Sequence, residues 1–328
     1  MWTFLTAMFV ACVAADRAGR RATQSSGKRT ILWRDLKCGA IHSDTLSMKT
    51  RERNLIVFDW SCHGIPTLPS VAEQLIALAS NENASTSELT ELISADPGLA
   101  VLILKAANSA FYSLNVEVTS IRHAIVLLGL PEVKRIALSA VLAERFLAVP
   151  REAKRVAMDL WRHLVATAVL ARDLSDEDEE PDPYTLGLLH DMGWLLFLVQ
   201  HPTSYMSFVQ EKSKGLREAE NLWGVDHQLL GAKLAEAWGL PEPFQVVALR
   251  HHDPLRDMAP PGYLFKVTFA NHLSSEIGFR SHAMFDEPLT PQIFDASHLM
   301  DGETYEEIRR AAFADRERIE GYCKLFLG

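Results

Sequence analysis

A long succession of helix signals, without any strand pattern, is the feature that most restricts how this chain can fold. From Pro66 onward, apolar residues recur at helical spacing and are divided by capping residues, prolines and glycines. Ser85 and Glu88 have the spacing of a capping box, and Asp96-Pro97 offers an N-cap followed by a first-turn proline. No segment alternates polar and apolar residues as a half-buried strand does. The pattern therefore predicts an all-α fold, a multi-helix bundle.

The predicted helices each combine an apolar face with a polar or helix-breaking residue at the ends. We expect them over residues 71–80, 89–95, 98–111, 121–129, 132–147, 151–174, 183–200, 203–214, 226–238, 241–252, 263–275 and 303–326. The acidic run that precedes the 183–200 helix is most simply a solvated connection. The 303–326 helix is amphipathic, with Ile308, Ala312, Ile319 and Phe326 on one face. We expect that face to pack on the bundle or to form a homo-oligomer contact.

Length, charge and cysteine content narrow the class of protein. The 328 residues carry 33 Lys plus Arg against 42 Asp plus Glu, a formal charge of −9. Such a chain lacks the basic surface that grips nucleic-acid phosphates, so we expect no nucleic-acid partner. Four cysteines lie far apart without a CxxC pair, which argues against a disulfide framework or a thiolate zinc site.

The first sixty residues differ from the rest. Met1–Ala15 is apolar, but it is shorter than the roughly 20 residues that span a bilayer, and arginines follow it where a signal peptide would have them in front. It is a weak export signal, a short anchor, or an extension upstream of the real start. We favour the last, with Met48 as the alternative start, because Gln24–Thr50 shows no periodicity. We therefore expect a cytoplasmic protein without stable membrane insertion.

Ionisable and amide side chains interrupt several of the apolar helices. Buried groups of this kind need partners or a function. They occur at five places, in the order Asp159 with His163, His190-Asp191, His227, His251-His252 and Asn271. Imidazole and carboxylate are good ligands for zinc, iron or manganese. Adjacent residues diverge by roughly 100° on a helix, so each of the two dipeptides is able to reach two metal ions.

Three of these places also have a structural interpretation. His251-His252 would satisfy the last carbonyls of a helix, His227 would lie on the surface in a first turn, and Asp159 with His163 would form an ion pair. We expect surface or core positions for three further histidines, His123, His201 and His272. The joint order favours a metal site, because all five places fall on separate predicted helices.

The order of these residues resembles the ligand order of the HD superfamily of metal-dependent phosphohydrolases. Its HD-GYP branch has Glu-xxx-His, His-Asp, His, His-His and a final Asp. Here Asp159 replaces the Glu, Asn271 stands in place of the Asp, and only Gly262-Tyr263 is left of the GYP loop. The resemblance implies one or two divalent ions (Fe, Mn or Zn) in an HD-like bundle. The metal ligands that it implies are His163, His190, Asp191, His227, His251 and His252.

A second resemblance covers about residues 65–278. The stretches ISADPGL (93–99), ANSAFY (107–112) and IRHAIVLLG (121–129) resemble the HD-related output domain, HDOD, and LLHDMGWLL and VDHQLLGAKLAEAWGLP extend the match. Members of this family have Asn at the position of Asn271 and are taken as regulatory output modules in bacterial signalling. The resemblance implies an HDOD domain over 65–278, between an N-terminal extension (1–60) and a C-terminal helical extension (279–328).

Three hypotheses follow for the function. The first is a regulatory output module that acts through signalling proteins without catalysis. The second is a metal-dependent phosphohydrolase with a di-metal site, in which two ions clamp a phosphoryl group from both sides. The third is a histidine cluster, with or without metal, that holds helices together.

Overall fold

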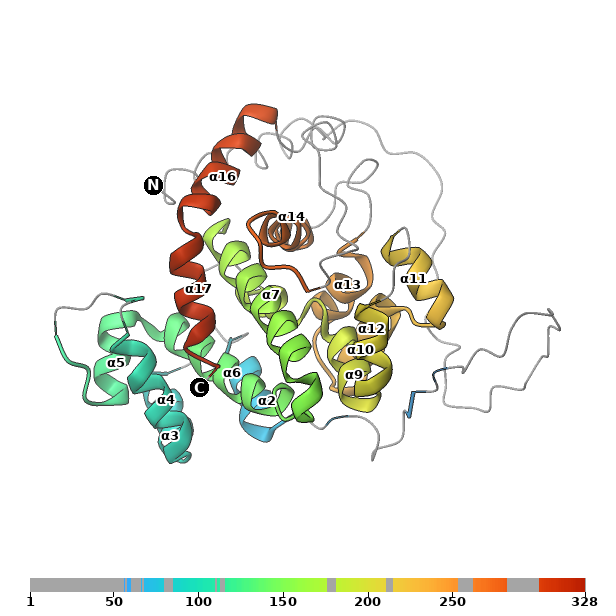
Figure 1. Cartoon of the computed structure of the whole chain (residues 1–328). Coiled ribbons are helices and arrows are strands. Elements are labelled where there is room, and N and C mark those ends of the chain that lie inside the picture. The colour runs from blue at the N-terminus through green and yellow to red at the C-terminus, as the bar shows by residue number, and fades with distance from the viewer. Residues whose placement is uncertain are drawn as a thin grey trace, which may run out of the picture.

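Helices account for nearly all of the secondary structure in the described part of this chain. The computed structural model describes residues 56, 58–59, 66, 68–79, 85–109, 111–112, 116–175, 181–210, 215–252, 262–281 and 301–327. These residues form helices and turns and contain no strand, which confirms the all-α prediction (Figure 1). The apolar run Met1–Ala15 and the alternative start Met48 lie outside the described residues.

Local capping signals set the start of the first helices. The helices are α2 (Ser70–Ala79), α3 (Thr86–Ser94), α4 (Pro97–Ala107) and α5 (Ile121–Leu128). Ser85 Oγ accepts from the Glu88 amide at 3.1 Å while the Glu88 carboxylate accepts from the Ser85 amide at 2.9 Å, so the predicted capping box is confirmed. Asp96 caps α4 by accepting from two amides at 2.9 and 3.1 Å. Helices α3, α4 and α5 pack together at one end of the molecule (Figure 1).

The ANSAFY stretch has a structural role at the end of α4. The Asn108 side chain accepts from the amide of Val118 at 2.8 Å and donates to the Val118 and Leu104 carbonyls at 2.8 and 2.9 Å. It thereby ties the end of α4 to the segment that enters α5. Ser120 caps α5, and Gly129, with φ of 85°, ends it.

The central part of the bundle is built around α7. Its helices are α6 (Leu130–Phe146), the 3-10 turn η2 (Arg151–Ala153), α7 (Lys154–Asp173), α8 (Pro183–Leu189), α9 (Met192–Gln200), α10 (Pro202–Val209), α11 (Leu216–Trp223), α12 (His227–Ala237), α13 (Glu242–Arg250) and α14 (Gly262–Glu276). Helices α8 and α14 both pack on α7, and α12 packs on α9 and α13. The helix predicted over 203–214 ends at Val209, with Gln210 in a turn, and residues 211–214 lie outside the described part of the chain. Helix α11 was not predicted.

The predicted single helix over 183–200 was also wrong, because it breaks at His190-Asp191. The ring Nδ1 of His190 donates to the carbonyl of Gly187 at 2.7 Å and so closes the end of α8. Asp191 leaves the helical region, with φ of −105° and ψ of 26°, and α9 begins at Met192. The two side chains therefore project from a junction between two helices instead of from one continuous helix.

Two glycines allow backbones to touch beside this junction. A Cβ on Gly193 would lie 1.9 Å from the carbonyl oxygen of His227, and a Cβ on Gly187 would lie 2.9 Å from Cα of Ala168. Glycine is required at both positions because any side chain would overlap another helix backbone. The first contact brings the start of α9 against the start of α12. The second brings α8 against α7.

The C-terminal extension packs on the bundle. The predicted 303–326 helix is instead two helices, α16 (Gly302–Ala314) and α17 (Arg316–Lys324), separated at Asp315. The break redirects the chain, and Arg316 Nε donates to the carbonyl of Ile277 at 2.7 Å. The four residues predicted to share a face are all buried. Helix α17 lies along α7 (Figure 1), and Tyr322 contacts Phe111 with ring centroids 4.6 Å apart.

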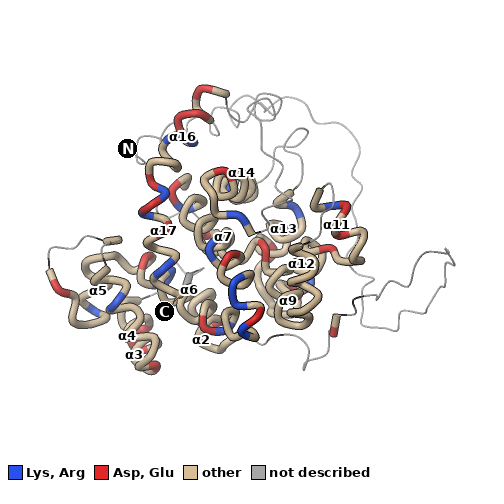
Figure 2. Tube along the Cα trace, viewed as in Figure 1, with Lys and Arg blue, Asp and Glu red and all other residues tan. Residues whose placement is uncertain are grey.

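Charged residues are distributed unevenly over these helices. Figure 2 shows acidic and basic positions on outer helices such as α11 and α16, whereas α9 has none. Within the described part of the chain, no helix combines the length and the apolar character needed to cross a membrane.

Candidate metal centre

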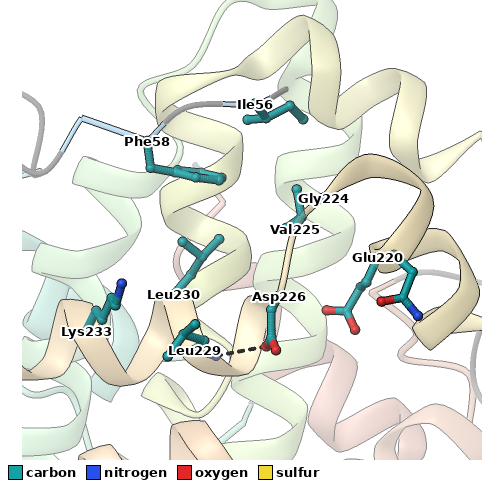
Figure 3. A pocket seen from close by; sticks show the side chains of 10 residues that line it. Ile56, Phe58, Glu220, Gly224, Val225, Asp226, Leu229, Leu230 and Lys233 are labelled. Atoms are coloured by element: carbon teal, nitrogen blue, oxygen red, sulfur yellow. Dashed lines mark hydrogen bonds between the residues drawn. The ribbon is translucent and has the colours of Figure 1, made fainter. Parts of the chain in front are cut away.

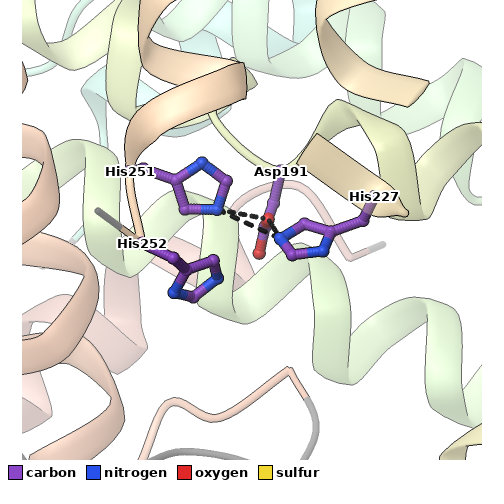
Figure 4. Close-up of side chains that lie close together, drawn as sticks. All are labelled: Asp191, His227, His251 and His252. Carbon is purple, nitrogen blue, oxygen red and sulfur yellow. Dashed lines mark hydrogen bonds and ion pairs between the residues drawn. The ribbon is translucent and has the colours of Figure 1, made fainter. Parts of the chain in front are cut away.

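The six residues predicted as metal ligands lie together in the interior of the bundle. They form two groups that share Asp191, and within each group one ligand atom per residue lies within 4.8 Å of the others. One group is His163, His190 and Asp191, and the other is Asp191, His227, His251 and His252 (Figure 4). Five of the six are at most 3% exposed, and His252 lies at the partly exposed edge.

The carboxylate of Asp191 divides the centre into two halves. Its Oδ2 lies 3.6 Å from Nε2 of His163 and 3.4 Å from Nε2 of His190. Its Oδ1 lies 3.4 Å from Nε2 of His227 and 3.0 Å from Nε2 of His251. Each oxygen thus faces its own pair of imidazoles, an arrangement that suits a carboxylate shared between two metal ions. We name these the His163 half and the His227 half.

The outer ring nitrogens of three histidines are held by backbone carbonyls. Nδ1 of His163 lies 2.8 Å from the carbonyl oxygen of Phe279, and Nδ1 of His190 lies 2.7 Å from that of Gly187. Nδ1 of His251 lies 3.0 and 3.1 Å from the carbonyl oxygens at the end of α13. A carbonyl only accepts, so each Nδ1 is the donor in these contacts and each ring turns its Nε2 towards Asp191. Metal-binding histidines are oriented in this way.

The fourth ring, His227, has a different outer partner. Its Nδ1 lies 2.5 Å from Oε1 of Glu220, and the same oxygen accepts from the His227 backbone amide at 3.0 Å. Trp194 stacks on the ring, with centroids 4.4 Å apart and an interplanar angle of 8°. Glu220 was not predicted from the sequence. The available signal was an acidic residue beside Ala219 on the buried face of α11, shortly before the predicted ligand His227.

The protonation states favour metal binding. Burial lowers the pKa of His190 to about 3, assisted by the nearby rings of His251 and His163 and opposed by Asp191. Burial would raise the pKa of Asp191, but electrostatic interaction with the neighbouring imidazoles, first His190 and His251 and then His163, holds that pKa well below its usual value. Burial also lowers the pKa of His252 well below its usual value. Near pH 7, His190 is neutral and Asp191 is ionised, as metal ligation requires.

Two ligand atoms of the centre have no hydrogen-bond partner among the described residues, namely Nε2 of His190 and Oδ1 of Asp191. Buried polar atoms are normally satisfied, and several converging acceptors repel each other without a cation between them. A nitrogen-and-oxygen donor set without thiolate suits iron, manganese or zinc. The side chains present therefore fit a divalent metal.

Two residues from the HD ligand order behave differently from the six. Asp159 is half-exposed and lies 4.0 Å from Arg155 and 3.9 Å from Arg162, so it is an ion-pair partner on the surface of α7. Asn271 is buried on α14, and its backbone carbonyl accepts from the hydroxyl of Ser274, whose oxygen lies 3.2 Å from Nδ1 of His163.

The three histidines expected outside the site are distributed over the molecule. His272 is partly covered, and burial together with His251 and His163 lowers its pKa to about 3. His201 contacts the rings of Phe58 and Phe197, at centroid distances of 5.3 and 6.4 Å. His123 is partly exposed on α5.

Comparison with known proteins gives one family match. A family model described as the HDOD domain matches residues 65–254. An uncharacterised protein of Treponema pallidum is 28% identical over 214 residues, which is 63% of this chain. This chain spans only 41% of the length of that relative.

Three solved structures share the fold. An HDOD domain protein of unknown function from Geobacter sulfurreducens aligns with a TM-score of 0.64 and 22% identity, over 80% of this chain and 94% of its own. A chain from Marinobacter aquaeolei, provisionally named as a signal transduction protein, aligns with a TM-score of 0.63 and 22% identity, over 80% of this chain and 60% of its own. A chain from Shewanella amazonensis, provisionally named as a phosphohydrolase, aligns with a TM-score of 0.57 and 19% identity, over 80% of this chain and 94% of its own.

Proposed function

Because this chain belongs to the HDOD domain family, we propose that it is a regulatory module of bacterial signal transduction that binds divalent metal in the bundle interior. The single observation that supports metal binding best is the convergence of four imidazole Nε2 atoms on the two oxygens of Asp191. The provisional name of the Marinobacter structure supports the signalling part. We propose signalling proteins as the partners and the cytoplasm as the location.

The ions would be held by His163, His190 and Asp191 in one half and by Asp191, His227, His251 and His252 in the other. Imidazoles contribute no charge, so the buried carboxylates Asp191 and Glu220 together balance a single divalent ion. A buried charge without compensation is costly. We therefore expect one ion to bind tightly and a second to bind more weakly, with an anion from solution.

The alternative is a metal-dependent phosphohydrolase, and one observation favours it. The two oxygens of Asp191 serve different halves, which suits two metal ions, and a pair of ions supplies Lewis acidity and an activated water for attack on a phosphoester. The partly exposed edge at His252 is where a substrate would reach the centre. Against catalysis stands Asn271, because an amide is a weaker metal ligand than the carboxylate of the HD-GYP order.

Metal content and turnover separate the two proposals. Purified protein is loaded with Fe, Mn or Zn, and bound metal is measured alongside hydrolysis of a phosphomonoester and a phosphodiester. Stoichiometric metal without turnover supports the regulatory module. Turnover that requires metal, and that rises in Asn271→Asp, supports the phosphohydrolase. Absence of bound metal in the wild type would overturn both.

A further inference from the structure

We propose that Glu220 is a positioning residue that makes the His227 half the tighter of the two metal-binding halves. The inference rests on the proposed metal binding and adds an order of occupancy and the residue that sets it. Glu220 contacts no ligand atom directly and acts through the ring of His227.

The geometry restricts the His227 ring to one orientation. A single Glu220 oxygen accepts from the ring Nδ1 at 2.5 Å and from the backbone amide at 3.0 Å, so side chain and backbone are held together. With Nδ1 as the donor, Nε2 is left to face Asp191 Oδ1 at 3.4 Å and His251 Nε2 at 3.3 Å. Stacking on Trp194 opposes tilting of the ring. The ligand atom is therefore in place before an ion arrives.

The outer partner of His227 differs in charge from those of the other anchored rings. His163, His190 and His251 donate to neutral backbone carbonyls, whereas His227 donates to a buried carboxylate. A hydrogen bond to a charged acceptor is roughly twice as strong as one to a neutral acceptor. A carboxylate partner also makes the imidazole a better electron donor to the metal. Only the His227 half receives this contribution.

The number of ligands also favours tighter metal binding in the His227 half. The His227 half offers three imidazoles and a carboxylate oxygen, and the His163 half offers two imidazoles and the other oxygen. Glu220 adds a second negative charge beside the half that already has more ligands. The first ion is therefore expected between His227, His251 and Asp191.

The side chain of Glu220 is buried, and Gln matches it closely in shape. It is 3% exposed and also borders a groove of about 600 Å³, lined by apolar side chains such as Phe58 and Leu230 and by the polar Asp226 and Lys233 (Figure 3). The amide oxygen of Gln at position 220 is able to accept the same two hydrogen bonds as the carboxylate. Glu220→Gln is therefore a change of charge with little change of shape.

The test compares the wild type, Glu220→Gln and the control Glu218→Gln, which alters an exposed glutamate on the same helix. Metal-stripped proteins are titrated with Co²⁺, bound metal is measured by equilibrium dialysis, and the visible Co²⁺ spectrum is recorded. We expect the tight binding of Glu220→Gln to weaken about 10- to 100-fold with an altered spectrum, as is typical when an outer partner is changed. The control should match the wild type.

Two further outcomes separate the inference from a purely structural role and from the proposed function. His190→Ala, which removes a ligand of the other half, should keep the tight Co²⁺ ion and its spectrum. If Glu220→Gln has the Co²⁺ affinity and the visible spectrum of the wild type, Glu220 does not set the order in which the two halves are occupied. The proposed metal binding would still stand. If the wild type binds no Co²⁺, the proposed metal binding fails and the inference fails with it.

Discussion

Nε2 of His251 lies 3.0 Å from Oδ1 of Asp191, although the two residues come from the end of α13 and from the junction of α8 and α9. The other oxygen of the same carboxylate faces His163 and His190. Asp191 is thus the one side chain common to both halves of the candidate centre. This position makes it the most informative residue to change.

Asp191→Asn should abolish binding at both halves. The amide keeps the size of the side chain but removes the charge and one good donor oxygen, so we expect metal affinity to fall more than about 100-fold, beyond the loss typical of an outer partner. Elemental analysis of dialysed protein measures the effect. Asp159→Asn is the matched control, because Asp159 is half-exposed on α7, and it should retain wild-type metal content. Equal loss in both variants would contradict the assignment.

Gly193→Ala should destabilise the protein and disturb the centre together. Its Cβ would lie 1.9 Å from the His227 carbonyl oxygen, so α9 and α12 must separate. We expect a loss of about 3 kcal/mol in the free energy of unfolding, the upper part of the usual range for overpacking, with reduced metal content. Urea denaturation monitored by circular dichroism measures it.

The control for this variant is Gly321→Ala on α17, where an added Cβ meets nothing within 4 Å. That variant should be neutral or gain up to about 1 kcal/mol from helix propensity. A Gly193→Ala protein as stable as Gly321→Ala would show that the helices do not approach as described.

Acid should destabilise the metal-free protein through its buried histidines. The pKa of His190 is lowered from 6.5 to about 3 in the folded chain, so between these values the unfolded state binds a proton that the folded state does not. The free energy of unfolding should therefore fall as the pH drops from about 6.5 towards 3, by at most about 1.4 kcal/mol per pH unit for one group.

Urea titrations at several pH values in metal-free buffer measure this slope. His190→Gln, which has no titrating ring at this position, should show a shallower dependence than the wild type. Identical slopes would mean that His190 is already protonated in the folded protein. Acid should release bound metal over the same range, because protons compete for the imidazoles.

Asn108→Ala should weaken the scaffold and leave the centre unchanged. The side chain satisfies the amide and the carbonyl of Val118 and the carbonyl of Leu104. Removing it takes the side-chain partner from the partly buried amide and carbonyl of Val118, at a cost of about 2 kcal/mol, whereas the Leu104 carbonyl still accepts from the Asn108 backbone amide. Thermal unfolding measures the loss, with Asn108→Asp as an intermediate variant that keeps the acceptor. A drop in metal stoichiometry of the folded variant would contradict a purely structural role.

Much of the fold could be predicted from local signals. The caps at Ser85, Asp96 and Ser120 act within a few residues of themselves, so their consequences appear in a short stretch of sequence. The apolar face of the C-terminal extension was predictable for the same reason. The break at His190-Asp191 was not, because it depends on a side-chain bond to Gly187 and on the contact between α9 and α12.

The sequence by itself determined the all-α class and the residue types able to bind a metal, in an order that resembles the HD superfamily. Only the tertiary structure decided which of them meet. It brought six residues together and left Asp159, one helical turn from His163, on the surface. It also placed the carboxylate of Glu220 within hydrogen-bond distance of the ring Nδ1 of His227. Helix signals are local, whereas a ligand set depends on how separate helices pack, and here that packing is set by backbone contacts at Gly187 and Gly193.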